Sequence, residues 1–186
     1  MAKLEKIGYG QLELNQVAFP RDGRIEAQCA LYEIKNPEDE GVGFGFDADG
    51  KEIPAENGMI LVVDNVTRTI KKTTKEGGNP GEIFALNYTT EHMYDDRDLG
   101  SLRKFKLLPG TFYPRLGYLA VGDKFTTNTV VHDKAITEGN YAVPNVDGYW
   151  KIVETYPTEA IIVAQVIKNT TMPDGQKAVK LQIVKA

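Results

Sequence analysis

Three short runs of apolar and β-branched residues constrain the fold most strongly, and all lie in the last seventy residues of the chain. They are residues 149–153, 160–167 and 178–184. The third run alternates, with Val179, Leu181 and Ile183 on one face, as a half-buried strand requires. The second run is apolar on both faces, which predicts a central strand covered on both sides. This part of the chain is therefore expected to be a compact all-β module.

Turn-forming residues connect these runs and others upstream. Pro173-Asp174-Gly175 has the chemistry of a tight hairpin, because proline sets φ and glycine supplies a positive φ. A second, smaller hairpin is expected at Asp49-Gly50, inside a Gly-, Asp- and Pro-rich excursion over residues 36–58. The 18 glycines and nine prolines, set between short apolar runs, indicate many turns and therefore many strands.

The first ninety residues also contain strand patterns. They are residues 11–15, 24–34, 59–68 and 83–88, and the third has the strongest core character. The first two are expected to pair as a hairpin across Asp22-Gly23. In the second, Ile25, Ala27, Cys29 and Leu31 share one face.

Together these patterns predict a mainly β fold. A C-terminal small antiparallel β-barrel or sandwich, with further strands at residues 118–121 and 124–131, is joined to an N-terminal β-rich lobe with long loops. The expected divisions are residues 1–90 for the N-terminal lobe, 91–116 for a linker or short helical turn, and 117–186 for the barrel.

Charge and hydropathy exclude several classes of protein. The formal net charge of −4 argues against a nucleic-acid-binding protein, since such domains usually carry a basic excess. No apolar run approaches the roughly 20 residues of a membrane helix, and the N-terminus lacks a signal-peptide core. Cys29 is the single cysteine, so no internal disulfide is expected. A fold without disulfides suits assembly in a reducing cytoplasm.

The residues that commonly carry catalysis do not form a recognisable motif. Ser101 is the only serine and lies outside a Gly-x-Ser-x-Gly turn, and Cys29 falls on the apolar face of a strand. His92, near Asp95, Asp96 and Asp98, and His132, next to Asp133, are the two histidines, and neither has zinc-ligand spacing. The sequence therefore favours a protein that is not an enzyme.

No cofactor or metal is expected either. Asp47, Asp49, Gly50 and Glu56 match parts of a calcium loop, but Gly45 would take the first ligand position. A hairpin explains the same residues. No phosphate-binding glycine loop is present.

Surface contacts with a partner are expected at basic and aromatic residues. Arg68, Lys71, Lys72 and Lys75 would form a basic tip, which is also an ordinary solvated edge in many β proteins. In the aromatic-rich C-terminal part, Trp150 is expected to point inward, leaving Tyr149 and Tyr156 as exposed contacts.

The segment Thr111-Phe-Tyr-Pro-Arg-Leu, continuing into Val121-Gly-Asp-Lys-Phe-Thr-Thr-Asn, resembles the capsid decoration (cement) proteins of tailed phages that infect Gram-positive bacteria. Gly139-Asn-Tyr-Ala-Val-Pro and Asp147-Gly-Tyr-Trp extend the resemblance, which covers about residues 83–186. Tyr113 and Arg115 lie within it and are further candidate contacts.

The resemblance implies a virion structural protein that binds the outer surface of the assembled head and stabilises it. The implied partner is the major capsid protein, with a homo-oligomer, such as a trimer, as the implied state. Assembly would take place in the cytoplasm of the host bacterium. The alternative is a carbohydrate- or host-surface-binding module of a phage tail or fibre, which requires exposed Tyr149 or Tyr156. A small hydrolase or metal enzyme is a third reading and requires a histidine to meet several carboxylates.

Overall fold

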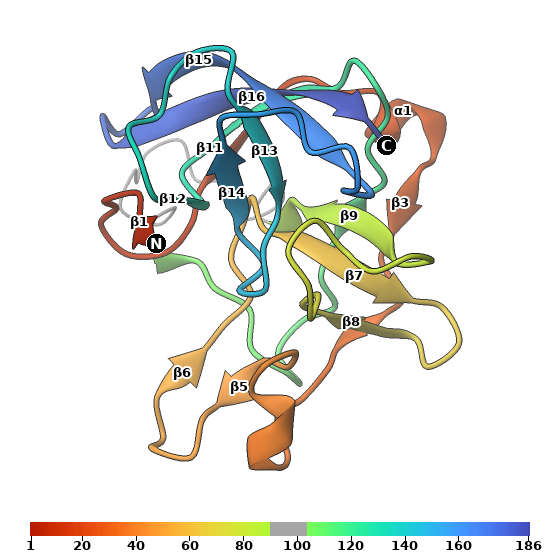
Figure 1. The fold of residues 1–186 in the computed structure, drawn as a ribbon. Coiled ribbons are helices and arrows are strands. Elements are labelled where there is room, and N and C mark those ends of the chain that lie inside the picture. Colours follow the sequence, from red (N-terminus) through yellow and green to blue (C-terminus); the bar gives the residue numbers. More distant parts are fainter. Residues whose placement is uncertain (90–103) are drawn as a thin grey trace.

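The computed structural model describes residues 1–89 and 104–186, and the fold is mainly β, as predicted (Figure 1). Eight strands form one sheet that curls into a half-barrel, in the order β1-β12-β14-β13-β15-β16-β11-β2. Their bounds are β1 Ala2–Lys3, β2 Leu12–Gln16, β11 Lys124–Thr127, β12 Val130–His132, β13 Tyr141–Pro144, β14 Trp150–Val153, β15 Val163–Thr171 and β16 Lys177–Lys185.

A second sheet of six strands packs below the half-barrel, in the order β3-β10-β9-β7-β8-β4. Its strands are β3 Ile25–Glu26, β4 Ala30–Leu31, β7 Ile60–Asp64, β8 Thr69–Lys71, β9 Ile83–Asn87 and β10 Leu116–Gly117. The remaining elements are two short helical turns and a small hairpin. The helical turns are α1 Phe19–Asp22 and η1 Pro37–Asp39, and the hairpin consists of β5 Gly45–Phe46 and β6 Glu52–Ile53.

The strands predicted from local pattern are confirmed where periodicity was strongest. The β15–β16 hairpin turns at residues 172–176, and β5 and β6 pair across the Asp49-Gly50 turn. β15 lies between β13 and β16, so the expected central position is confirmed. The expected cover on both faces does not extend along the whole of β15, because Lys168 and Asn169 are exposed. The expected strand over residues 24–34 is instead two strands of two residues each, β3 and β4.

The expected hairpin across Asp22-Gly23 is wrong. β2 pairs with β11 of the half-barrel, whereas β3 pairs with β10, so the two segments enter different sheets. Helix α1 causes this separation: Gly23 adopts φ 70° and closes the turn back onto Phe19, which is fully buried. The chain is thereby turned away from β2 before β3 begins.

Each of the two sheets contains strands from both halves of the sequence. β1 and β2, from the first sixteen residues, belong to the half-barrel with the C-terminal strands, and β10 pairs with β9 of the six-stranded sheet. Half of the segment expected as a linker, residues 91–103, lies outside the described residues. This half includes His92, Asp95, Asp96, Asp98 and Ser101.

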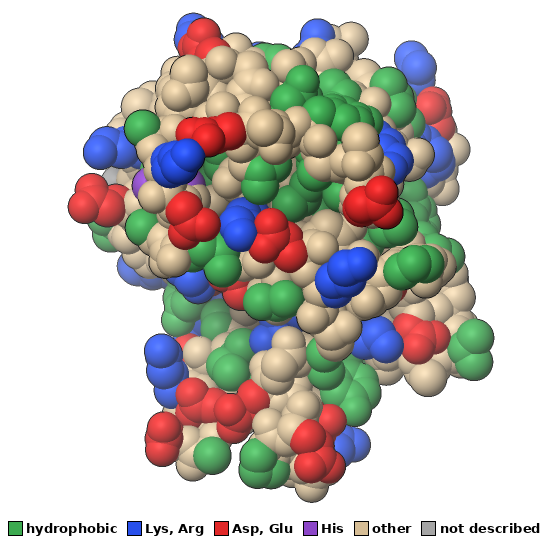
Figure 2. All heavy atoms as spheres, viewed as in Figure 1, with side chains coloured by type: hydrophobic (Ala, Val, Ile, Leu, Met, Phe, Trp, Pro, Cys, Tyr) green, Lys and Arg blue, Asp and Glu red, His purple; other side chains and the backbone are tan. Residues whose placement is uncertain are grey.

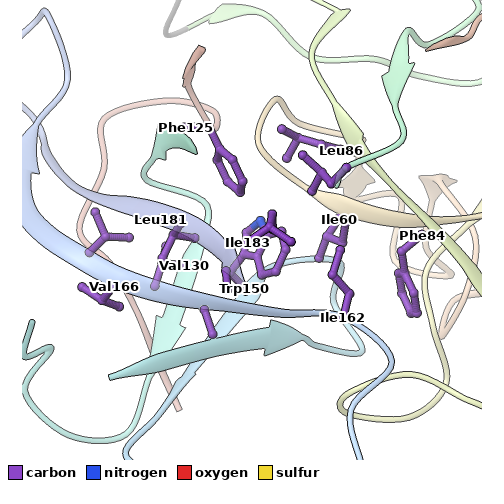
Figure 3. Close-up of a cluster of buried hydrophobic side chains, with 14 of the residues drawn as sticks. Ile60, Phe84, Leu86, Phe125, Val130, Trp150, Ile162, Val166, Leu181 and Ile183 are labelled. Carbon is purple, nitrogen blue, oxygen red and sulfur yellow. The ribbon is translucent and has the colours of Figure 1, made fainter. Parts of the chain in front are cut away.

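The main core lies between the two sheets (Figure 3). Ile60, Phe84 and Leu86 of the six-stranded sheet meet apolar side chains of the half-barrel, and the Trp150 Nε1 donates a hydrogen bond of 3.1 Å to the Gly58 carbonyl. The half-barrel contributes Phe125, Val130, Trp150, Ile162, Val166, Leu181 and Ile183. The opposite face of the six-stranded sheet is also covered, by a cluster that includes Phe44, Leu107 and Tyr149.

Residues 36–53, containing η1, β5 and β6, extend from the six-stranded sheet at the end of the molecule away from β15 and β16 (Figure 1). We call this segment the arm. Its root is fixed by backbone hydrogen bonds, from Ile34 N to the Phe44 carbonyl at 2.9 Å and from Lys72 N to the Val42 carbonyl at 2.9 Å. The tip of its hairpin is exposed, including Phe46.

Candidate functional site

Three segments that are distant in the sequence form a cavity of about 300 Å³ at the surface of the half-barrel. They are the loop after β8, the β13–β14 hairpin and the loop before β15. Backbone hydrogen bonds fix the walls: Gly77 N donates to the Pro144 carbonyl and Ile161 N to the Gly77 carbonyl, both at 2.8 Å. Gly77 adopts φ 78° and lies against Ala160, so glycine suits this close approach.

Tyr156 and Lys75 give this cavity its chemical character. The Tyr156 ring is 45% exposed and stands edge-on to Tyr141, with ring centroids 5.2 Å apart and planes at 89°. Lys75 is exposed and has no acidic partner within the described chain, whereas neighbouring Glu76 pairs with Lys151 at 2.7 Å. An aromatic face beside a free ammonium group suits a ligand that combines an apolar ring face with an anionic or hydroxyl group.

The structure therefore brings two of the predicted contact residues, Lys75 and Tyr156, into one cavity although 81 positions separate them. The sequence predicts a basic tip that contains both Lys75 and Arg68. Instead, Arg68 lies at the β7–β8 turn, where it donates a hydrogen bond of 2.7 Å to Oε1 of Gln28. Lys71 is half-buried, with its Nζ 4.0 Å from the Asp64 carboxylate.

The expectation that Lys72 belongs to an exposed tip is wrong, because this side chain is 6% exposed. Its Nζ donates a hydrogen bond of 2.9 Å to the Glu40 carbonyl at the root of the arm and lies 5.6 Å from the centre of the Phe44 ring. Burial lowers the pKa of Lys72 to about 8, because desolvation disfavours the charged ammonium. Lys72 therefore holds the arm and is not a surface contact.

The expectation that Tyr149 is an exposed contact is also wrong, since it is 2% exposed. Its hydroxyl donates a hydrogen bond of 2.6 Å to Oε1 of Glu56 and accepts one of 2.7 Å from Lys6 Nζ. Oε2 of the same carboxylate accepts hydrogen bonds from Lys6 Nζ and from the Gly10 N–H. The Lys3 ammonium lies 4.2 Å from the centre of the Tyr149 ring.

This buried group explains why both neighbours, Tyr149 and Trp150, are inside. Trp150 faces the main core as predicted, while the opposite face of β14 is covered by the N-terminal segment and residue Glu56. Burial, followed by the nearby Glu56 charge, raises the pKa of Tyr149, and burial lowers the pKa of Lys6 despite its pairing with Glu56. Nothing in the sequence pairs these residues, because their partners are set by the tertiary fold.

Tyr113, a predicted candidate contact, is exposed, and so is its neighbour Phe112, which was not predicted. Their side chains are 65% and 60% exposed. The loop is ordered on both sides: the Thr111 hydroxyl donates a hydrogen bond of 2.6 Å to the Leu108 carbonyl, and Pro114 is buried. Arg115 is half-buried, and its backbone N–H donates to Oγ1 of Thr89 at 2.9 Å.

The residues considered for metal and acid–base chemistry have structural roles where they are described. Asp47 Oδ1 accepts the N–H groups of Asp49 and Lys51, at 3.1 and 2.7 Å, as a hairpin turn requires. Among the described residues, no group of three or more His, Cys, Asp or Glu side chains converges as a metal site. Cys29 is 2% exposed, and burial raises the pKa of its thiol.

His132 lines a different cavity, of about 490 Å³, between β1 and the ends of β15 and β16. Its Nδ1 lies 3.0 Å from the Lys134 carbonyl, and Glu5 is the one carboxylate among the described lining residues. The hypothesis of a small hydrolase or metal enzyme requires several carboxylates around a histidine. The cavity at His132 does not supply them, because Glu5 is its one lining carboxylate among the described residues.

Comparison with protein-family models, with curated protein sequences and with solved structures gave no match. In the ranges 1–89 and 104–186, no helix has the length and apolar character needed to cross a membrane.

Proposed function

We propose that this chain is a virion structural protein that decorates the outer surface of an assembled phage head and stabilises it. The observation that carries the proposal is the pair of aromatic side chains at Phe112 and Tyr113, exposed side by side on an ordered loop. Two adjacent exposed aromatics are costly in water and are the residue types that dominate the energetics of protein interfaces. The pair lies within the segment that resembles the decoration proteins.

The ordered loop reduces the cost of binding. The Leu108–Thr111 turn and buried Pro114 hold the backbone on both sides of the two aromatic residues, so little backbone entropy is lost on docking. The major capsid protein is the proposed partner, and several copies of a modest contact would give stable attachment across neighbouring subunits. Localisation on the virion, after assembly in the cytoplasm of the host bacterium, follows from this proposal.

The Val-Gly-Asp-Lys-Phe-Thr-Thr-Asn part of the resemblance has a different role. Thr127 and Asn128 are fully buried, with the Thr127 hydroxyl donating to the Gln11 carbonyl at 2.9 Å and Asn128 Oδ1 accepting the Gln11 N–H at 2.7 Å. These residues join β2 to β11 inside the fold. We therefore place the contact surface on the loop at residues 108–115 and assign the motif to stability.

The test is co-sedimentation of the purified protein with phage heads that lack it, followed by heating. Wild-type protein is expected to bind saturably, at a fixed ratio to coat subunits, and to make the heads more heat-resistant. F112S/Y113S should lose at least about tenfold in affinity, because hot-spot aromatics typically contribute 2 kcal/mol or more each. V66S is the matched control, since Val66 is 94% exposed on the β7–β8 turn. No binding by the wild type would overturn the proposal.

The cavity at Tyr156 supports a second candidate, a carbohydrate- or host-surface-binding module. Within one cavity, Tyr156 offers an exposed ring and Lys75 an ammonium that has no acidic partner among the described residues. Binding to purified host cell-wall glycans would be measured for wild type, Y156A and Y113A. Loss of binding in Y156A alone would establish this function; no glycan binding by the wild type would exclude it.

A further inference from the structure

Charge is distributed unevenly along the molecule. The arm, residues 36–53, contains six acidic residues and one lysine, which gives it a formal charge of −5. Because the whole chain carries −4, the remainder carries +1. Figure 2 shows acidic side chains gathered over the lower part of the molecule, where the arm lies in Figure 1. The arm is thus a strongly anionic projection from a nearly neutral body.

The fold keeps these charges on the arm ionised and partly unpaired. Glu38 and Asp49 are exposed and have no basic partner within the described chain. Backbone N–H donors, led by that of Lys35, lower the pKa of Asp39, so its carboxylate stays charged. Phe46, 54% exposed on the same hairpin, adds an apolar group among the carboxylates.

At the other end of the molecule, the outer face of the half-barrel presents lysines. Lys168 of β15 and Lys180 of β16 are directly opposite one another in the sheet register. Lys180 faces Thr126 and Gln182 faces Lys124 on the adjacent strand, so Lys124 shares the same face. No ion pair involves any of these three lysines among the described residues. We call Lys124, Lys168 and Lys180 the lysine face.

This arrangement costs free energy in an isolated chain. Like charges directly opposite in a sheet repel one another. Glu13 of β2, opposite Thr126, is on the same face, but it forms no ion pair with the three lysines among the described residues. An anionic surface docked there would relieve the repulsion, and the lysine stems would pack against an aromatic ring with their ammonium groups near its face. The arm supplies both features, carboxylates and Phe46.

The arm and the lysine face lie at opposite ends of the molecule, so one copy does not neutralise itself (Figure 1). We propose that the arm of one copy docks on the lysine face of a second copy, giving a head-to-tail contact between identical chains. Such a contact uses two different surfaces, and it closes into a ring or continues as a chain depending on the rotation between copies. The inference is independent of the capsid-decoration proposal, because it concerns free protein.

Sedimentation velocity over a range of concentrations tests the contact without phage heads. Wild-type protein is expected to associate at low salt, and the association should weaken at least about tenfold between roughly 0.05 and 0.5 M salt, because screening shortens the reach of surface charges. E38K/D49K replaces the two unpaired carboxylates of the arm by lysines and takes its formal charge from −5 to −1. K168E/K180E replaces two of the three lysines of the lysine face by glutamates. Each variant alone should lose association by at least about tenfold.

The decisive sample is an equimolar mixture of E38K/D49K and K168E/K180E. The intact acidic arm of K168E/K180E then meets the intact lysine face of E38K/D49K, and the lysines introduced at positions 38 and 49 meet the glutamates introduced at positions 168 and 180, so association should return. E138K/E159K and K104E/K134E change net charge by the same amounts at exposed positions elsewhere and should associate like wild type. A monomeric wild type, or a mixture that fails to associate, would overturn the inference. If the protein binds heads but stays monomeric when free, the capsid-decoration proposal stands and the head-to-tail contact is wrong.

Discussion

The Tyr149 hydroxyl donates a hydrogen bond of 2.6 Å to Oε1 of Glu56, joining β14 to the segment before β7 across 93 positions of the sequence. The same carboxylate holds Lys6 and the Gly10 N–H, so one buried acid connects the N-terminal segment, the base of the arm and the half-barrel. Burying the Glu56 carboxylate is tolerated only while its hydrogen-bond donors remain, because an unpaired buried charge costs the fold free energy.

Removing the Tyr149 hydroxyl should therefore destabilise the fold. Tyr149→Phe leaves one carboxylate oxygen without its donor, and we expect a loss of about 1–3 kcal/mol in the free energy of unfolding. Urea denaturation followed by Trp150 fluorescence measures it. Tyr156→Phe, which removes a hydroxyl from an exposed ring, is the control and should change stability by less than about 0.5 kcal/mol.

Lys72 should make stability depend on alkaline pH. Its pKa is about 8 in the folded chain against 10.5 as the ordinary value, so between these values the unfolded chain binds more protons. Stability from this group therefore rises as pH increases through that window, by about 1–2 kcal/mol between pH 7 and 9.5. Asp147, Lys3 and Glu40 are the charged groups that act on it.

The measurement compares wild type with Lys72→Met by urea denaturation at several pH values. The difference in unfolding free energy between the two should shift in favour of wild type as pH rises. Measurements stop below pH 10, because the raised pKa of Tyr149 makes stability fall above that point as the unfolded tyrosine ionises. A difference that is constant with pH would show that Lys72 titrates normally.

Gly58 is expected to be one of the least replaceable glycines. It adopts φ 82°, and an added Cβ would overlap the hydroxyl oxygens of Thr127 and Thr129. Those hydroxyls are buried and share a hydrogen bond of 2.6 Å, so they have no free space to move into. Gly58→Ala should cost about 3 kcal/mol or more, from strain and overpacking together.

Gly81→Ala isolates the backbone part of this effect. Gly81 has a similar φ of 87° but no atom within 4 Å of an added Cβ. The Gly81→Ala variant should lose only about 1 kcal/mol of unfolding free energy, because the left-handed backbone conformation is then the only source of strain. Equal midpoints of thermal unfolding for the two variants would contradict the overlap with Thr127 and Thr129.

Asp123 should contribute to stability through hydrogen bonds. The carboxylate is buried and accepts the Ala120 N–H at 2.9 Å and the Ala18 N–H at 3.1 Å. Asp123→Ala leaves both donors without this acceptor, and we expect a loss of about 1–3 kcal/mol in unfolding free energy. Asp133→Ala, at an exposed ion pair with the N-terminus, should lose less than about 1 kcal/mol. Denaturant midpoints that do not differ would rule out this role.

Much of the local structure follows from sequence pattern. The alternation of Val179, Leu181 and Ile183 predicts β16, and the turn chemistry at Pro173-Asp174-Gly175 predicts its hairpin with β15. Tyr113 and Tyr156, which the sequence singles out as candidate contacts, are both exposed. Burial on one face of a strand and positive φ in a turn are properties of neighbouring residues, so the sequence carries them directly.

The candidate site was less predictable. Lys75 and Tyr156 share a cavity because Gly77 docks against Pro144 and Ile161, contacts between segments far apart in the chain. Tyr149 and Lys72 are polar residue types that are commonly found at the surface. In this fold the N-terminal segment and Glu56 cover Tyr149, and the arm covers Lys72. Periodicity distinguishes the two faces of a strand but gives no information about what packs on the second face.

The sequence by itself determined that this chain is β-rich, where its long hairpin turns, and which strands are apolar, because these properties depend on residues a few positions apart. Only the tertiary structure decided that β2 joins β11 and not β3, that Tyr149 is buried on Glu56, and that an acidic arm and a lysine face lie at opposite ends. The reason is physical: strand pairing and burial of a second face depend on the free energy of contacts between distant segments, which local pattern does not encode.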